Sequence, residues 1–268
     1  MSASPALEAD RVSYRAGRAL LVDDATLRVD SGEVVALAGP NGAGKSTLLA
    51  LLAGDLRPSA GAVRVGGASP RARSARELAR LRAVLPQATR LPFSFTVRQV
   101  VSMGRSPHLG PLGRLGARDR EVVAAQMQRV EVLELADRSF PTLSGGEAAR
   151  ASLARVLAQE TPVVLLDEPT AALDLRHQEV VMRTARELAG GGAAVVMVLH
   201  DLNLAAAHAD RVGLMSRGRL VACAPPWRAL TAERVREVFE QPVRVARHPS
   251  RDCPLIVADH VGAAAPHP

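Results

Sequence analysis

The 268-residue sequence is poor in cysteine, in aromatic residues and in long apolar runs. Its two cysteines, Cys223 and Cys253, form neither a disulfide framework nor a metal-binding pattern. No apolar run approaches the roughly 18 to 20 residues that a membrane-spanning helix needs. The N-terminus carries Glu8 and Asp10 and lacks the apolar block of a secretory signal. We therefore expect a chain that does not cross a bilayer and that stays in the cytoplasm.

Lysine is almost absent, although the chain is basic. Lys45 is the only lysine among the 34 basic residues, and the formal net charge is +7. The arginines are scattered and lack the basic block typical of nucleic-acid-binding segments, so we expect no nucleic-acid partner. A basic surface near anionic lipid would explain the charge equally well. With 47% hydrophobic residues, the chain can bury the core of one large domain.

Strand and helix patterns alternate through most of the chain. The apolar runs at 34–38, 163–166 and 194–199 are typical of fully buried strands, and the first two are each followed by a helix pattern. Such alternation predicts a parallel, doubly wound α/β sheet, because parallel strands need crossover connections. The segments 7–15 and 26–30 are predicted to form antiparallel strands. Further strands are expected at 62–65, 83–85, 211–215 and 219–224, and helices at 46–53, 74–81, 175–188 and 231–239.

The pattern changes between Pro92 and Pro141. Apolar residues there recur at three- and four-residue spacing, as in Val122, Val123 and Met127, which indicates an inserted group of helices. The Ala/Pro-rich end of the chain, 263–268, is predicted to be disordered.

A glycine-rich loop follows the first buried strand. Its sequence fits the phosphate-loop template and lies between a strand and a helix, as that template requires. Backbone amides and the positive end of the helix would cradle phosphate oxygens, while the Lys45 ammonium would meet the outer phosphates. The hydroxyl of Ser46 would bind Mg²⁺. The predicted nucleotide-binding residues are Gly39, Pro40, Asn41, Gly42, Ala43, Gly44, Lys45, Ser46 and Thr47.

Two carboxylates follow the buried strand at 163–166. An aspartate at the carboxyl end of such a strand, here Asp167, can hold Mg²⁺. Apolar strands that end in aspartate are common, so the pattern alone could be structural. Downstream of a phosphate loop it indicates a nucleotide site, in which Glu168 is placed to orient and deprotonate the attacking water.

A second glycine-rich segment, Leu143-Ser144-Gly145-Gly146-Glu147, precedes a helix pattern that runs to about residue 159. Its amides could bind a phosphate, although an isolated segment of this kind could equally cap a helix. Together with the phosphate loop and the acidic strand, this signature makes the sequence resemble the ATP-binding cassette (ABC) family over about residues 7–239.

The resemblance implies the fold and the cofactors. It implies an α/β P-loop ABC-type ATPase that uses ATP and Mg²⁺. Its parts would be a RecA-like parallel-sheet core, an antiparallel β subdomain and a helical subdomain inserted at about 88–160. The ATP-binding domain would span 7–243, and a C-terminal tail would span 244–268.

The resemblance also implies a dimer. In that family the signature of one subunit closes over the ATP held by the other, so two copies of this chain would form a head-to-tail ATP sandwich. Ser144, Gly145 and Gly146 would then act in trans. Asp174 resembles the residue of the loop that communicates across the dimer.

Three further landmarks are assigned by the resemblance. Tyr14, the only tyrosine, resembles the aromatic residue that stacks on adenine, although it could simply lie on a strand face. Gln87 resembles the glutamine that senses Mg²⁺ and the transport partner, with an ordinary loop residue as the alternative. His200 resembles the switch histidine that contacts the γ-phosphate. As a departure from the family pattern, Ala148 and Ala149 stand where polar residues are common.

The segment from Leu91 to His108 is more specific than the other motifs. With the segment 248–256, it resembles ATP-binding subunits of importers of haem, ferric siderophores and cobalamin, most closely those of haem (hemin). An apolar groove that receives a helix of any membrane subunit would explain the same residues.

The resemblance therefore implies an ATPase that couples ATP hydrolysis to haem import through separate integral membrane permease subunits. A periplasmic or surface haem-binding protein would take part indirectly. Such a subunit would lie peripherally on the cytoplasmic face of the inner membrane. The competing functions are a ferric siderophore or cobalamin importer and, further away, a soluble ABC-type ATPase of iron–sulfur assembly.

Overall fold

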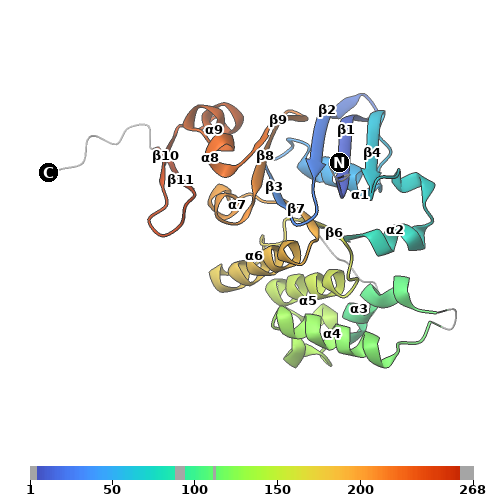
Figure 1. Cartoon of the computed structure of the whole chain (residues 1–268). Coiled ribbons are helices and arrows are strands. Elements are labelled where there is room, and N and C mark those ends of the chain that lie inside the picture. The colour runs from blue at the N-terminus through green and yellow to red at the C-terminus, as the bar shows by residue number, and fades with distance from the viewer. Residues whose placement is uncertain (1–4, 88–93, 111–112, 260–268) are drawn as a thin grey trace.

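The computed structural model describes residues 5–87, 94–110 and 113–259. Part of the segment from Leu91 to His108, namely Leu91 to Phe93, and the end predicted to be disordered, 263–268, lie outside the described residues. The described chain forms a central sheet, a smaller antiparallel sheet, a group of helices and a C-terminal hairpin (Figure 1). Within these residues, no helix has the length and apolar character needed to cross a membrane.

The central sheet has the strand order β5-β6-β7-β3-β8-β9. Its strands are β3 (Val34–Ala38), β5 (Arg82–Leu85), β6 (Val163–Asp167), β7 (Ala194–Val198), β8 (Arg211–Ser216) and β9 (Arg219–Ala224). All neighbours are parallel except β8 and β9, which pair antiparallel across a tight turn. The predicted parallel sheet is confirmed, with an antiparallel strand added at one edge. Every residue of β3, β6 and β7 is buried, which explains their continuous apolar sequences.

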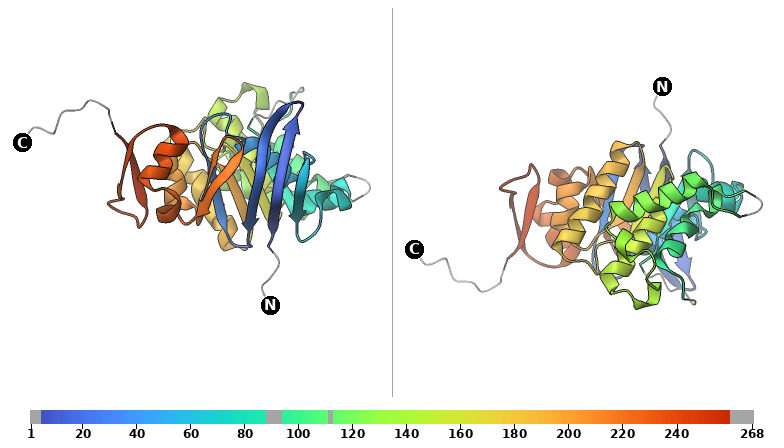
Figure 2. Two further views of the ribbon diagram at one scale, coloured as in Figure 1. Left: turned by 90° about the horizontal axis from the view of Figure 1, so that it is seen from above. Right: turned by 90° about the horizontal axis from the view of Figure 1, so that it is seen from below.

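A second sheet, with strand order β2-β1-β4, is antiparallel and covers part of the central sheet (Figure 2). Its strands are β1 (Leu7–Ala16), β2 (Ala19–Val29) and β4 (Ala60–Val65). Helix α1 (Lys45–Ala53) packs leucines into an apolar core that it shares with residues of both sheets. Gly44 and Gly54, at its two ends, have φ of 98° and 79°. Because this left-handed conformation favours glycine, these two residues determine where α1 begins and ends.

The helix that precedes β5 packs Leu78 and Leu81 against the core of α1, and the other helices pack against the core on the opposite face of the central sheet. The helices are α2 (Ala75–Leu81), α3 (Val97–Ser102), α4 (Ala117–Arg129), α5 (Gly145–Leu157), α6 (Leu175–Gly190), α7 (Leu202–His208), α8 (Pro226–Ala229) and α9 (Ala232–Phe239), with 3₁₀ turns η1 (Pro70–Ala72), η2 (Met103–His108), η3 (Leu133–Leu135) and η4 (Phe140–Thr142). Ser74, Thr96 and Ser144 begin α2, α3 and α5 with capping boxes, in which the Ser or Thr oxygen and a Glu or Gln three residues later each accept a backbone N–H. The region predicted to be helical therefore contains α3, α4 and α5.

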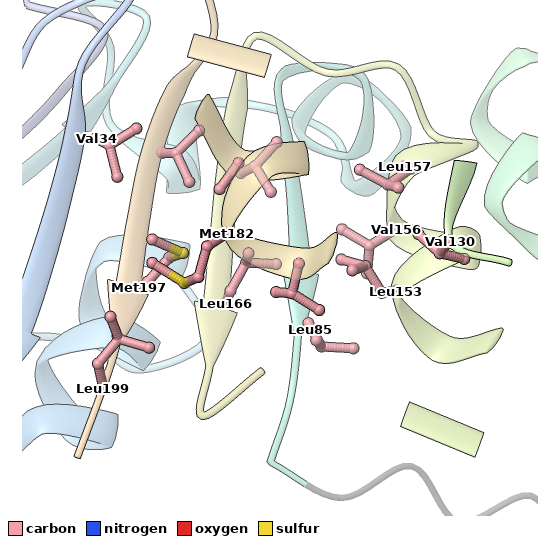
Figure 3. Packing of buried hydrophobic residues seen from close by; sticks show 14 of the residues in the cluster. Val34, Leu85, Val130, Leu153, Val156, Leu157, Leu166, Met182, Met197 and Leu199 are labelled. Carbon is pink, nitrogen blue, oxygen red and sulfur yellow. The ribbon is translucent and has the colours of Figure 1, made fainter. Parts of the chain in front are cut away.

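One apolar core continues from the central sheet into these helices (Figure 3). Leu166 of β6 and Met197 of β7 belong to the same cluster as Leu153 of α5 and Val130 after α4. The inserted helices therefore share their core with the sheet. Because close-packed interiors transmit displacement, α5 is mechanically linked to β6.

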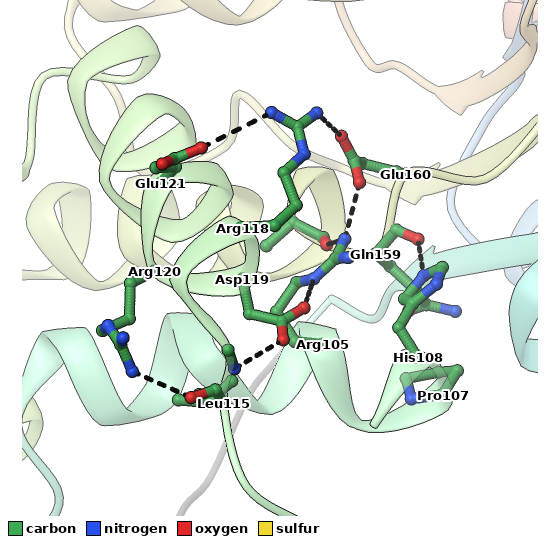
Figure 4. A network of polar contacts seen from close by, with 12 residues as sticks. Arg105, Pro107, His108, Leu115, Arg118, Asp119, Arg120, Glu121, Gln159 and Glu160 are labelled. Carbon is green, nitrogen blue, oxygen red and sulfur yellow. Dashed lines mark hydrogen bonds and ion pairs between the residues drawn. The ribbon is translucent and has the colours of Figure 1, made fainter. Parts of the chain in front are cut away.

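A buried arginine adds a polar connection between the helices (Figure 4). Arg105 in η2 is only 5% exposed. Its Nε donates to Asp119 Oδ1 of α4 at 2.9 Å, and its Nη1 donates to Glu160 Oε2 at 2.7 Å and to Ala158 O at 2.8 Å. We call these four residues the Arg105 junction. It joins η2, α4 and the segment that follows α5, and every charge in it has an opposite partner.

A β-hairpin follows α9. Its strands, β10 (Val243–Arg247) and β11 (Pro254–Ala258), pair antiparallel and lie beside α7 and α9 at the end of the molecule away from α3 and α4 (Figures 1 and 2). Residues from 244 onward were expected to form a tail, and the sequence did not predict this hairpin. Short α7 and α8 were not predicted either.

Candidate functional site

The phosphate loop connects β3 to α1 and is held in a tight space. A Cβ atom on Gly39 would lie 2.2 Å from Met215 O, and one on Gly44 would lie 2.4 Å from Leu21 O. Both glycines also have positive φ, at 154° and 98°. Only glycine fits at these two positions, and the close approach presses the loop against β8 and β2.

Lys45 lies at the start of α1 and is 6% exposed. Its Nζ donates to Gly39 O at 2.8 Å and to Pro40 O at 3.0 Å. Burial lowers the pKa of Lys45, while the carboxylates of Glu168 and Asp167 act in the opposite direction. In the described part of the chain its hydrogen-bond partners are thus two neutral carbonyls. A negatively charged ligand that binds beside such a buried ammonium is strongly stabilised, because a charged acceptor forms a stronger hydrogen bond than a neutral carbonyl.

Ser46 and Asp167 meet although they are far apart in the sequence. Ser46 Oγ donates to Asp167 Oδ1 at 3.1 Å. Burial raises the pKa of the Asp167 carboxyl, while this hydrogen bond and the charge of Lys45 oppose the shift. A hydroxyl and a carboxylate are the hard oxygen donors that Mg²⁺ prefers, and Mg²⁺ normally completes its octahedron with water and substrate phosphate. This pair of oxygen donors fits Mg²⁺ held jointly with a phosphate. The described ranges hold no group of three or more His, Cys, Asp and Glu residues that forms a metal cage.

Glu168 is at the centre of a second polar group. Its Oε2 accepts a hydrogen bond from Gln87 Nε2 at 3.0 Å, and its Oε1 lies 2.6 Å from His200 Nε2. These residues follow β6, β5 and β7, three neighbouring parallel strands whose carboxyl ends meet at one edge of the sheet. Glu168 itself has φ of 50°, a left-handed conformation that is uncommon outside glycine and is often found at functional sites.

A cavity of about 680 Å³ opens between the phosphate loop and this polar group. It is lined by Leu21, Asn41, Gly42, Ala43, Gly44, Lys45, Ser46, Thr47, Gln87, Glu168 and His200. The structure thus brings together the predicted phosphate-loop residues and the three polar residues after the strands. Gly39 and Pro40 contribute the carbonyls that hold Lys45, and Asp167 reaches the cavity through Ser46.

Tyr14 does not line this cavity. It lies in β1 opposite Val22, half-buried, and packs against the core shared by the two sheets. Its assignment as the residue that stacks on adenine remains a prediction.

The signature residues also lie away from the large cavity. Ser144 Oγ accepts the Glu147 N–H at 3.3 Å, and Ser144 N donates to the Glu147 carboxylate at 2.7 Å, so this residue caps α5. Gly145 lines a smaller cavity of about 170 Å³ together with Glu168 and Gln87. Ala148 and Ala149, the departure from the family pattern, line the same small cavity.

Asp174 lies at the start of α6. Its carboxylate accepts the His177 N–H at 2.9 Å, and one of its oxygens is 2.7 Å from His177 Nδ1. This N-cap and its backbone hydrogen bond lower the pKa of Asp174. Within one chain, Asp174, like Gly146, is not part of the large cavity.

Two elements of the site were not predicted from the sequence. Leu21 of β2 lines the large cavity, and the β8–β9 turn supports the phosphate loop, because Gly218 N donates to Ala43 O at 3.0 Å. The sequence predicted a turn at 216–218 but carries no signal that would place it beside a loop so distant in the chain.

A phosphate loop at the end of a buried central strand, facing an acidic strand end across the same sheet, defines an α/β nucleotide-binding protein of the P-loop class. The ABC transporter family matches residues 22–171. The hemin import ATP-binding protein HmuV of Nocardia farcinica is 52% identical over 237 residues, which cover 88% of this chain and 82% of that protein. HmuV of Streptomyces coelicolor is 54% identical over 241 residues, which cover 90% of this chain and 85% of that protein.

Solved structures agree with the sequence comparison. A metal-chelate-type ABC transporter in an inward-facing conformation matches with a TM-score of 0.82 and 28% identity, over 96% of this chain and 98% of that one. A dimeric ATP-binding cassette in a post-hydrolysis state, bound to ADP and Pi, matches with a TM-score of 0.73 and 25% identity, over 82% of this chain and 98% of that one. The chain belongs to the ABC transporter family and carries the ATPase cassette of that family.

Proposed function

We propose that this chain is the ATP-hydrolysing subunit of a haem (hemin) importer. The observation that carries the proposal is its 52–54% identity, over most of both chains, to proteins that are named hemin import ATP-binding proteins. The geometry of the large cavity supports the ATPase part, since it combines a phosphate loop, a buried lysine and carboxylates.

ATP binds with its phosphates on the amides of the phosphate loop and at the N-terminus of α1. Lys45 exchanges its carbonyl partners for phosphate oxygens, which stabilises the bound state because a charged acceptor is stronger than a neutral one. Ser46, Asp167 and Gln87 are the residues that would hold Mg²⁺. The ion, when bound, would neutralise charge that builds up on the phosphate oxygens during transfer.

Glu168 acts as the general base and His200 contacts the γ-phosphate. A water oxygen attacks the γ-phosphorus, the bond from the γ-phosphorus to the bridging oxygen breaks, and the water proton passes to Glu168. Gln87 and His200 hold both oxygens of Glu168 at 3.0 and 2.6 Å. Each oxygen of Glu168 keeps a second lone pair that can accept the proton, and the direct contact with this base makes Gln87 a means of linking hydrolysis to events outside the cavity.

The active form is a homodimer in which each signature completes the partner's ATP site. Ser144, Gly145 and Gly146 lie outside the large cavity of their own chain, as a residue that acts in trans should. The Ser144 hydroxyl lies at the N-terminus of α5, where its oxygen accepts the Glu147 N–H, and it is a group that could also donate to a phosphate. Asp174 would lie at the same interface.

Coupling to transport would occur through integral membrane permease subunits at the cytoplasmic face of the inner membrane. The surface near Gln87 and the segment up to His108 would receive a permease helix. Phe95 in this segment is half-buried and packs against the main core, so a charged substitution there would disturb the fold as well as the docking surface.

The second candidate is import of a ferric siderophore or cobalamin. The match to a metal-chelate-type transporter at a TM-score of 0.82 favours this candidate over a soluble iron–sulfur-assembly ATPase, which is the third.

Uptake into reconstituted vesicles tests the proposal. The full chain is combined with the permease of the same organism, and ATP-dependent accumulation of hemin, a ferric siderophore and cobalamin is compared. We expect hemin to accumulate with the wild type and not with the Glu168→Gln variant in the same vesicles. Accumulation of another cargo alone would overturn the haem assignment, and failure of any permease to copurify would favour the soluble ATPase.

A further inference from the structure

The C-terminal hairpin holds helix α7 at both of its ends. This helix begins immediately after His200, the residue whose Nε2 lies 2.6 Å from Glu168. The hairpin has no place in the ATPase reaction described above, yet it is in contact with the helix that follows this histidine.

The first attachment lies in the first turn of α7. Asn203 Nδ2 donates to Ile256 O at 3.1 Å, and Asn203 Oδ1 accepts the Ile256 N–H at 2.8 Å. The side-chain amide thus occupies the open edge of β11 as a neighbouring strand would. Two such bonds fix the distance and the orientation of α7 relative to the hairpin.

The second attachment lies at the far end of α7. Arg251, in the turn of the hairpin, donates through Nη2 to Glu179 Oε1 of α6 at 3.2 Å, and its Nη1 is 3.0 Å from His208 Nε2. The same ring nitrogen lies 3.2 Å from Glu179 Oε2. His208 is buried, whereas the side chains of Arg251 and Glu179 are 42% and 48% exposed, so water reaches the charged partners of this contact.

The residues from His200 to Asn203 lead directly into the capped start of α7. The Asp201 carboxylate accepts the N–H groups of Asn203 and Leu204 at 2.7 and 3.1 Å, which caps α7 directly beside the histidine. A mainly apolar cavity of about 430 Å³ lies between this segment, α9 and the hairpin, with His200 on its wall. Across this space, the two bonds of Asn203 are the hydrogen bonds that the described residues make between the start of α7 and the hairpin.

We propose that the C-terminal hairpin keeps His200 in its hydrolysing position through Asn203, which makes Asn203 a positioning residue for ATP hydrolysis. The proposal rests on the proposed function, since it takes His200 as the residue that contacts the γ-phosphate. A shift of about 1 Å at a catalytic group can cost a factor of about 100 in rate. The loss of both Asn203 hydrogen bonds, only three residues from His200, is therefore sufficient to lower ATP turnover.

The test measures ATP turnover and ATP affinity of the full chain as separate quantities. Asn203→Ala removes both bonds, and we expect kcat to fall roughly 10- to 100-fold while the dissociation constant for ATP changes less than about twofold. Asn203→Asp keeps the acceptor for Ile256 N–H and loses only the donor. A carboxylate in the first turn of a helix is well tolerated, so this variant should fold and show a smaller fall in kcat. Asn203→Asp therefore tests the proposal even if the Asn203→Ala variant does not fold.

Two controls distinguish positioning from a general loss of structure. Arg244→Ala removes an ion pair with Asp259 at 3.0 Å on the hairpin and leaves α7 untouched, so its kcat should equal that of the wild type. His200→Ala should lower kcat by about 100-fold or more, and adding Asn203→Ala to it should change kcat less than about twofold, because the residue being positioned is already gone.

The outcomes separate the inference from the proposed function. If Asn203→Ala has wild-type kcat while His200→Ala is inactive, the positioning role is wrong and the function of His200 stands. Independent, multiplying losses in the double variant would also overturn it, as would a joint loss of ATP affinity and kcat in both Asn203 variants. Wild-type turnover by His200→Ala would instead refute the proposed role of the histidine, and the inference with it.

Discussion

The nucleotide cavity and the Arg105 junction each contain a buried cation, and the two cations have different partners. Lys45 and Arg105 are 6% and 5% exposed. Arg105 meets two carboxylates and a carbonyl, all from the chain itself. Among the described residues, the hydrogen bonds of Lys45 go to two carbonyls of its own loop, and the carboxylates of Glu168 and Asp167 act on it without a hydrogen bond.

The difference shows how burial of charge separates a structural site from a binding site. A buried charge needs an opposite partner, and leaving it without one is costly. In the Arg105 junction the chain supplies that partner, so the arginine holds three segments together. In the nucleotide cavity the carboxylates of Glu168 and Asp167 are not hydrogen-bonded to Lys45, so a charged hydrogen-bond partner is left to the ligand and Lys45 remains available for phosphate.

The strongest test of this comparison removes the base from the cavity. Glu168→Gln keeps the size and the hydrogen-bonding capacity of the side chain but cannot accept the proton of the attacking water. We expect ATP turnover to fall about 10²- to 10⁴-fold with little change in ATP affinity. ATP should then hold the chain as a dimer in size-exclusion chromatography with light scattering. Equal turnover in variant and wild type, or a variant that stays monomeric with ATP, would contradict the role of Glu168.

A substitution in the Arg105 junction should lower the stability of the chain instead of its ATP turnover. Arg105→Met leaves Asp119, whose side chain is 17% exposed, without this partner, while Glu160 is 39% exposed and keeps Arg118, so the free energy of unfolding should fall by about 2 kcal/mol. Chemical denaturation measures this fall. Arg118→Met is the matched control, because Arg118 reaches the same Glu160 at 3.6 Å from an exposed position and should cost less than about 1 kcal/mol. Equal losses in the two variants would show that burial does not set the strength of this junction.

Lys45→Ala should change ATP binding more than stability. The free energy of unfolding should change little, because the hydrogen bonds of Lys45 go to carbonyls, whereas the bound phosphates lose a charge-assisted partner. We expect ATP affinity to fall about 10- to 100-fold, measured by equilibrium binding of a fluorescent ATP analogue. The Glu168→Gln variant should bind normally in the same assay. A folded Lys45→Ala variant with unchanged affinity would end the comparison between the two cations.

His208 is a further buried basic group, and it extends the comparison to the pH dependence of stability. Burial lowers the pKa of His208 from its ordinary value of 6.5, and Arg251 and Arg186 act in the same direction, while Glu179 opposes it. The unfolded chain therefore takes up a proton near pH 6.5 that the folded chain resists, so stability should decline below about pH 6.5 by at most about 1.4 kcal/mol per pH unit. Below the lowered pKa of the folded state this contribution levels off. Denaturation curves across this range should show a shallower decline for His208→Gln, and an identical decline would exclude His208 as the cause.

The predictable part of the site lies in short segments. The phosphate loop, the strand that ends in Asp167 and the capped signature helix are each encoded by neighbouring residues, through apolar periodicity and the needs of backbone amides. For this reason β3, β6 and α5 were predicted close to their observed bounds. The C-terminal hairpin was missed because its two strands are short and have no two-residue turn between them.

The sequence by itself determined which segments carry phosphate-binding and acidic chemistry, because those properties depend on local spacing. Only the tertiary structure decided which side chains meet. Ser46 and Asp167 are 121 residues apart, and Gln87 and Glu168 are 81 apart. Nor does the sequence distinguish a lysine left open to a ligand from an arginine closed by Asp119 and Glu160. That distinction depends on burial and on partners brought by distant elements, and the packing of the sheet and helices supplies both.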